Sequence, residues 1–68
     1  MALNMYVFDR DKESGMKFGI SNKEYYIFFN DTWNKILTDN YDEAKRIYEK
    51  ACFEHSIDEA RRLNKVIF

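Results

Sequence analysis

Proline is absent from the chain, and glycine, cysteine and histidine are rare: two, one and one among 68 residues. A single cysteine excludes an internal disulfide, so we expect an intracellular, cytoplasmic protein. The first residues include no basic leader, and Asp9 interrupts their apolar run. We therefore expect neither a signal peptide nor a transmembrane segment, and no membrane partner.

Charge of one sign is also missing, because 11 basic residues stand against 12 acidic ones for a formal net charge of −1. A dedicated nucleic-acid binder normally has a clear excess of basic residues. The length predicts one small domain over 1–68, and a core of this size supplies only about 3–5 kcal/mol of net stability.

A similar seven-residue segment occurs twice, as YDEAKRI at 41–47 and IDEARRL at 57–63. A capping side chain precedes each copy and a glutamate follows it three positions later: Asn40 with Glu43, and Ser56 with Glu59. This spacing predicts capping boxes at the starts of two helices. We do not expect a repeat array, because stacked repeats need about three copies.

One unbroken helix would not place both copies on one core. At about 100° per residue, the sixteen steps between them turn the two apolar stripes roughly 160° apart. A break near residues 55–56 solves this, and we predict helices over about 41–54 and 57–66. The stripe of the first helix is Tyr41, Ala44, Ile47, Tyr48 and Ala51. The stripe of the second is Ile57, Ala60 and Leu63, with Ile67 at its frayed end.

Upstream of these helices the apolar residues alternate with a period of two, which is typical of strands. We predict strands over 3–8, 16–20, 24–29 and 32–37, with Gly15 at positive φ in the first loop, SNK as the second turn and residues 30–31 as a two-residue turn. The last strand has an alternative, a short helix over Trp33 and Leu37. The predicted fold is α+β: an antiparallel meander of three or four strands followed by two short helices, ββββαα.

Strict alternation divides the strand residues between two sides of the sheet, with Phe28 facing Trp33 and Ile27 facing Asn34. One side is an ordinary core layer: Leu3, Met5, Val7, Met16, Phe18, Ile20, Tyr25, Ile27, Phe29 and Ile36. The other side, the predicted aromatic face, has rings around a glycine: Tyr6, Phe8, Lys17, Gly19, Tyr26, Phe28, Trp33 and Lys35. An antiparallel sheet normally turns polar residues to water, so this face needs an explanation.

Two explanations of the aromatic face are possible. Each helix could cover one side, which makes the face a second core. If both helices cover the same side, the exposed patch reaches several hundred Å², near the upper limit for monomers without a binding function. We then expect a protein partner, and a two-fold homodimer as one form of it. The expected partner-binding residues are Tyr6, Phe8, Lys17, Tyr26, Phe28, Trp33 and Lys35.

Single-stranded nucleic acid is the alternative partner of the same face. Aromatic sheets stack bases, and Lys17 and Lys35 are placed to meet phosphates. A basic cluster in the second helix, Arg61, Arg62 and Lys65, would add to such a site. Backbone neutralisation needs several cations along one track, however, so the sequence favours protein over nucleic acid.

No motif predicts catalysis, a cofactor or a metal. Cys52 and His55 have the i, i+3 spacing of paired ligands, but the chain has no second cysteine or histidine. The loop DRDKESG resembles the start of an EF-hand, yet Ser14 stands where its glycine is required and Ile20 where its bidentate glutamate belongs. We therefore expect a non-enzymatic protein without a cofactor.

Phe, Tyr, Ile, Asn and Lys are abundant in the chain, and their codons are AT-rich, which favours a low-GC source. In size and composition the chain is similar to the small proteins with which phages and mobile elements occupy a host protein, such as anti-CRISPR inhibitors. That similarity implies an inhibitor or regulator and identifies no target.

Overall fold

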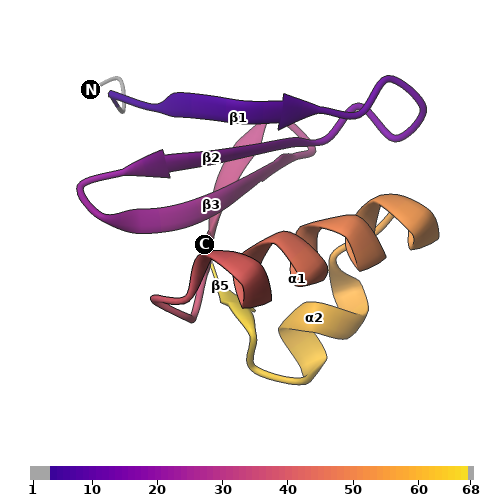
Figure 1. Cartoon of the computed structure of the whole chain (residues 1–68). Coiled ribbons are helices and arrows are strands. Elements are labelled where there is room, and N and C mark those ends of the chain that lie inside the picture. The colour runs from indigo at the N-terminus through magenta and orange to yellow at the C-terminus, as the bar shows by residue number, and fades with distance from the viewer. Residues whose placement is uncertain (1–3, 68) are drawn as a thin grey trace.

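The computed structural model describes residues 4–67, which form one five-stranded sheet and two helices (Figure 1). The strands are β1 (Tyr6–Arg10), β2 (Lys17–Ser21), β3 (Glu24–Phe29), β4 (Thr32–Ile36) and β5 (Val66–Ile67), and the helices are α1 (Tyr41–Glu54) and α2 (Asp58–Arg62). Strands follow one another across the sheet in numerical order, each antiparallel to its neighbour. The predicted α+β fold with a four-stranded meander before two helices is confirmed, and a short fifth strand is added.

Two-residue turns connect β2 to β3 and β3 to β4. Asn22 and Lys23 have φ of 55° and 65°, and Asn30 and Asp31 have φ of 56° and 62°. Positive φ at both central residues defines a type I′ turn, whose twist matches that of the flanking strands. The predicted register of β3 and β4 is therefore confirmed, and the alternative of a short helix at this point is wrong. The pairs include Phe28 with Trp33 and Ile27 with Asn34.

Helix α1 begins and ends at the predicted residues. Asn40 is its N-cap, and the Asn40 side chain accepts a hydrogen bond from the Glu43 backbone N–H at 2.9 Å. In a capping box the Glu43 side chain would accept directly from the Asn40 backbone N–H. Here the Thr38 hydroxyl bridges the two: it accepts from the Asn40 N–H at 3.2 Å and donates to the Glu43 carboxylate at 2.6 Å. At the other end His55 adopts a left-handed φ of 57°, which ends the helix. This is the break that the two apolar stripes predicted near residues 55–56.

Helix α2 is shorter than the predicted helix over 57–66. Asn64 adopts a left-handed φ of 59°, and the Lys65 backbone N–H donates to the Ala60 carbonyl at 2.8 Å. The chain therefore reverses after Arg62, and its last described residues pair with β4 as β5.

The predicted capping box at Ser56 is also wrong. Ile57 occupies the N-cap position of α2, and the Ser56 hydroxyl instead accepts from the Asp58 N–H at 3.0 Å. Glu59, the expected second member of the box, forms an ion pair with Lys50 of α1 at 2.9 Å. The two similar segments, 41–47 and 57–63, therefore both lie at the start of a helix, but the two helices are capped differently.

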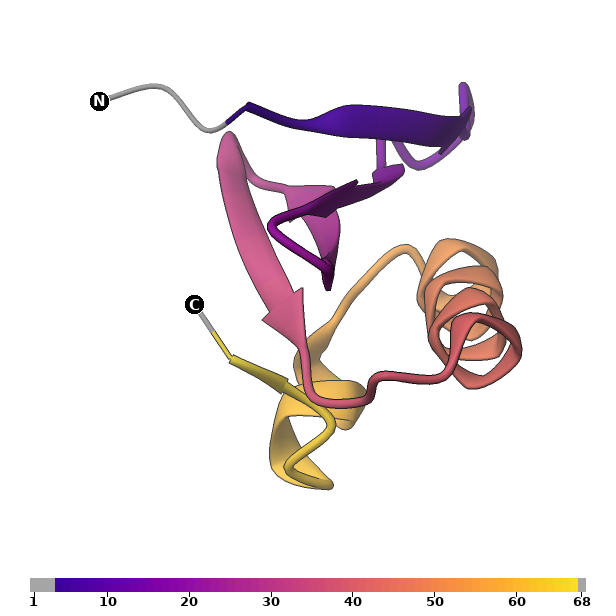
Figure 2. The ribbon, with the colours of Figure 1, turned by 60° about the vertical axis from the view of Figure 1, so that its left-hand side comes forward.

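Both helices lie on the same side of the sheet, which excludes the alternative of one helix on each side (Figure 2). Tyr48 of α1 stacks on Phe18 of β2 with ring centroids 5.2 Å apart, and its hydroxyl donates to Asp9 Oδ2 at 2.9 Å. Tyr41 and Leu63, predicted to be in the helix stripes, are instead 40% and 47% exposed. The buried core consists of Met16, Phe18, Ile27, Ile36, Ala44, Ile47, Tyr48, Ala51, Ile57 and Val66.

Strand β1 has a bulge that the alternation did not predict. Val7 pairs with Gly19 and Asp9 pairs with Phe18, so Phe8 is the additional residue on β1. A bulge of this kind reverses the side on which the flanking side chains lie. Phe8 lies on the helix side, where its ring is 5.2 Å from that of Phe18.

The bulge makes the predicted sides of β1 wrong. Tyr6 pairs with Ile20 on the helix side and contacts the Phe8 ring at 5.3 Å, so neither ring belongs to the face opposite the helices. Val7 lies on that opposite face instead of in the core. Met5 also leaves the predicted core layer, because its side chain lies against Gly19. Leu3, predicted in the same layer, is outside the described residues.

Candidate functional site

Two rows of paired residues cross the side of the sheet that faces away from the helices. The first row is Arg10, Lys17, Phe28 and Trp33, and the second is Val7, Gly19, Tyr26, Lys35 and Ile67. We call these residues the open face, because neither α1 nor α2 covers them (Figure 2). The rings of Tyr26, Phe28 and Trp33 are partly buried by their neighbours, and Ile67 is 48% exposed.

Aromatic and charged groups on the open face contact one another. The rings of Phe28 and Trp33 meet edge to face with centroids 5.0 Å apart, and the Lys17 ammonium lies 4.7 Å from the Phe28 ring centroid. Lys35 pairs with Glu24, and the hydrogen bond to this carboxylate raises the pKa of the Lys35 ammonium. The open face is therefore rich in rings, and among the described residues its one ion pair with a carboxylate is that of Lys35 with Glu24.

The structure brings together five of the seven predicted site residues: Lys17, Tyr26, Phe28, Trp33 and Lys35. Tyr6 and Phe8 lie on the other side of the sheet because of the bulge. Arg10, Val7 and Ile67 were missed. Extending the first strand by two residues would have added Arg10, whereas nothing local in the sequence indicates that Ile67 is in a strand.

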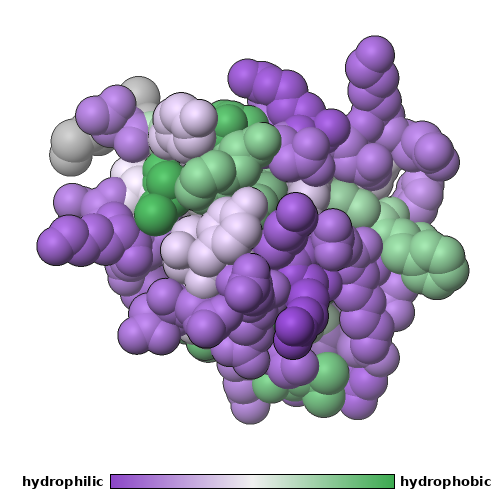
Figure 3. All heavy atoms as spheres, viewed as in Figure 1, coloured by the Kyte–Doolittle hydropathy of each residue, from purple (hydrophilic) through white to green (hydrophobic). Residues whose placement is uncertain are grey.

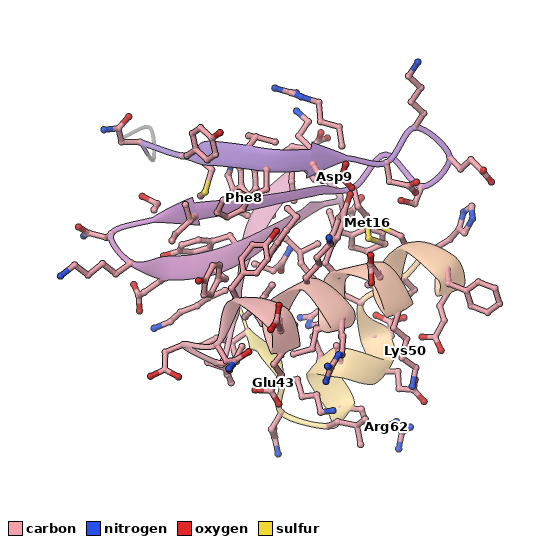
Figure 4. All side chains as sticks on the ribbon, in the orientation of Figure 1. Phe8, Asp9, Met16, Glu43, Lys50 and Arg62 are labelled. Carbon is pink, nitrogen blue, oxygen red and sulfur yellow. The ribbon has the colours of Figure 1, made fainter. Side chains whose placement is uncertain are left out.

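A second set of rings lies on the helix side, around the buried ring of Phe18. We call Tyr6, Phe8, Tyr25 and Tyr41 the helix-side ring cluster. Tyr6 is 66% exposed and Phe8 39%, and the Phe8 and Tyr41 rings meet edge to face at 5.4 Å. Figure 3 shows pale and green spheres gathered above α1 over the first strands, and Figure 4 places Phe8 there. This apolar surface was not predicted as a site.

A groove of about 230 Å³ separates α1 from α2. Ile47, Ala51, Ala60 and Leu63 line its apolar part, and the Lys50–Glu59 ion pair bridges the two helices beside it. Pockets for small-molecule ligands usually measure roughly 300–1,000 Å³, so the groove is small for that purpose.

The Cys52 thiol and the Tyr48 phenol lie against the hydrophobic core. Burial raises the pKa of the Cys52 thiol, which disfavours the nucleophilic thiolate at neutral pH. Burial likewise raises the pKa of the Tyr48 phenol, which keeps it protonated as the donor to Asp9. Within residues 4–67, no three His, Cys, Asp or Glu side chains converge as metal ligands. Neither helix in this part of the chain has the length and apolar character needed to cross a membrane.

Comparison of the chain with protein-family models, curated proteins and solved structures finds no match.

Proposed function

We propose that the chain is a non-enzymatic protein-binding module that acts through the open face. One observation carries the proposal: both helices pack on the same side, and the other side of the sheet remains rich in rings. Tyrosine and tryptophan often dominate the binding energy of protein interfaces. At about 25 cal/mol per Å², burial of a few hundred Å² of such a surface contributes several kcal/mol to a complex.

The size and aromatic composition of the chain support a narrower proposal, that it is an inhibitor or regulator of the kind made by phages and mobile elements. Such a protein blocks a host protein by occupying its surface and needs no catalytic group. The open face supplies the surface, and its target follows from the experiment below.

The alternative, a nucleic-acid-binding regulator, has less support. This function requires the rings and the basic cluster of the second helix to contact the same nucleic acid. However, α2 lies on the opposite side of the sheet from Phe28 and Trp33 (Figure 2). One short strand of nucleic acid therefore cannot contact both. Within the described part of the chain, the cations beside the rings are Arg10, Lys17 and the internally paired Lys35.

Trp33→Ala is expected to weaken the complex with the partner protein by about 30-fold or more, as for an aromatic hot spot worth about 2 kcal/mol. The partner is identified by affinity capture on the immobilised chain and then purified for titration calorimetry. Phe53→Ala is the matched control, because Phe53 is 87% exposed on α1 and lies on the helix side.

Ile67→Asn separates loss of binding from loss of folding, since Ile67 is half-exposed at the edge of the open face. This variant should weaken the complex while its thermal unfolding stays close to that of the unchanged chain. A partner that binds both open-face variants with unchanged affinity would contradict the proposal.

We also propose that the chain forms a two-fold homodimer, with the helix-side ring cluster as the contact. Of the two surfaces, this one has the more exposed rings: Tyr6 is 66% exposed, and Phe8 and Tyr41 are 39% and 40% exposed. Ring pairs across such a contact contribute about 0.5–1.5 kcal/mol each beyond area burial. The open face then stays free for the partner.

Tyr6→Lys should convert the dimer to a monomer at micromolar concentration, because two charges would meet across the two-fold contact. Light scattering measures the mass. Phe53→Lys makes the same kind of change at another exposed ring and should leave the dimer intact, as should Trp33→Ala. A chain that is monomeric at all concentrations, or a dimer that Trp33→Ala abolishes, would show that the contact is assigned wrongly.

A further inference from the structure

Two cations lie side by side at one end of the open face. Arg10 of β1 pairs in register with Lys17 of β2, and the same row continues into Phe28 and Trp33. Like charges directly opposite each other on neighbouring strands destabilise a sheet. This like-charge pair opposes folding and lies beside the rings of the open face. Its position indicates that the open face binds a negatively charged group there.

No carboxylate within residues 4–67 forms an ion pair with Arg10 or Lys17. The nearest acids along the chain are engaged elsewhere: Asp9 accepts from the Tyr48 hydroxyl at 2.9 Å, and Asp11 accepts from the Ser14 backbone N–H at 3.0 Å. The positive charge at this corner is therefore available to an external anion.

A protein carboxylate fits this corner better than a nucleic acid does. The Lys17 ammonium lies over the Phe28 ring, where a base would have to stack. The Phe28 and Trp33 rings are inclined by 61°, so they form no flat platform for successive bases. A second copy of the chain does not fit either, because the carboxylate it would offer from this side, Glu24, already pairs with Lys35.

The geometry points to an acidic segment of another protein as the partner of the open face, an inference that rests on the proposed function. A carboxylate of this segment lies between Arg10 and Lys17, and an apolar side chain of the same segment packs on Trp33. The distance across the sheet from the midpoint between β1 and β2 to β4 is two and a half strand spacings, or about 12 Å. An extended peptide spans this distance with roughly three to four residues. The recognised segment therefore has an acid three or four positions from an aromatic or large aliphatic residue.

Selection of displayed random dodecapeptides on the immobilised full chain tests this inference. The enriched peptides should contain aspartate or glutamate at that spacing from an apolar residue. A synthetic peptide with the selected sequence should shift the fluorescence of Trp33, the single tryptophan, and should bind at least ten-fold more tightly than the same peptide with its acids replaced by the matching amides.

Arg10→Glu should weaken the acidic peptide at least ten-fold, while its thermal midpoint stays equal or rises because an opposite-charge pair replaces the like-charge one. That result separates lost binding from lost folding. Arg46→Glu is the matched control: it makes the same change of charge on α1, on the other side of the sheet, and should bind the peptide as the unchanged chain does.

The remaining outcomes each overturn the inference in a distinct way. Enriched peptides without acids, or equal binding by Arg10→Glu, would remove the acidic partner and leave a protein-binding face. If no peptide is enriched on the immobilised chain relative to a surface without it, the inference of an acidic partner segment is also overturned. Retention of a mixed single-stranded oligonucleotide pool that weakens steeply with salt would overturn the proposed function as well.

Discussion

Phe18→Ala should leave the chain largely unfolded at 25 °C. Phe18 is fully buried, and its ring contacts four others at centroid distances between 5.2 and 5.9 Å: Phe8, Tyr25, Tyr41 and Tyr48. Removing a buried phenylalanine typically costs about 3–5 kcal/mol. That loss equals the whole net stability of roughly 3–5 kcal/mol that a single small core supplies.

Circular dichroism and urea titration measure this effect directly. Phe53→Ala deletes the same ring from a site that is 87% exposed, so its stability should stay within about 0.5 kcal/mol of the unchanged chain. A cooperative transition of Phe18→Ala close to that of Phe53→Ala would contradict the prediction, and would show that the rings around Phe18 are not one stabilising cluster.

Gly19→Ala should destabilise the chain by about 1–3 kcal/mol, although alanine normally suits a strand better than glycine does. A Cβ at Gly19 would lie 2.8 Å from the Tyr6 carbonyl oxygen and 2.9 Å from Met5 Cγ. Real Cβ atoms do not approach other atoms so closely, so β1 would have to move away from β2. Thermal unfolding of the purified variant measures the loss.

A double-mutant cycle with Met5→Ala tests the cause of this loss. If side-chain crowding contributes, Gly19→Ala should cost less in the Met5→Ala background than in the unchanged chain. Gly15→Asn is the comparison for a glycine needed only for its backbone: its φ is 78°, nothing lies within 4 Å of a Cβ there, and asparagine tolerates this conformation. An increase in stability on Gly19→Ala would show that the close approach of β1 to Gly19 is absent.

Local chemistry accounts for the parts of the candidate site that could be predicted. The type I′ turn of Asn30 and Asp31 determines that Phe28 pairs with Trp33. Once that pair is set, alternation places Lys17, Tyr26 and Lys35 on the same side without further information. Each step depends only on residues close to one another in the chain or directly paired.

The errors in the candidate site come from interactions between distant residues. Alternation placed Tyr6 and Phe8 on the predicted aromatic face, but the bulge puts both rings on the helix side. There Asp9 accepts from Tyr48, 39 residues later. Beyond the bulge Arg10 keeps the side that alternation gives it, where it pairs with Lys17. A single strand carries no signal for the bulge, because the bulge depends on the side chains of α1 that lie against β1.

The sequence by itself determined the α+β class, the meander, the turns and the bounds of α1, because capping and turn preferences act over a few residues and are strong at Asn40, His55 and the two asparagine turns. Only the tertiary structure decided which side of the sheet both helices cover, where β1 bulges and that Val66–Ile67 form β5. The Leu37 N–H donates to the Lys65 carbonyl at 2.7 Å, and Val66 is buried in the core. A two-residue strand has too few local contacts to form alone, so it exists only where β4 and the core already lie beside it.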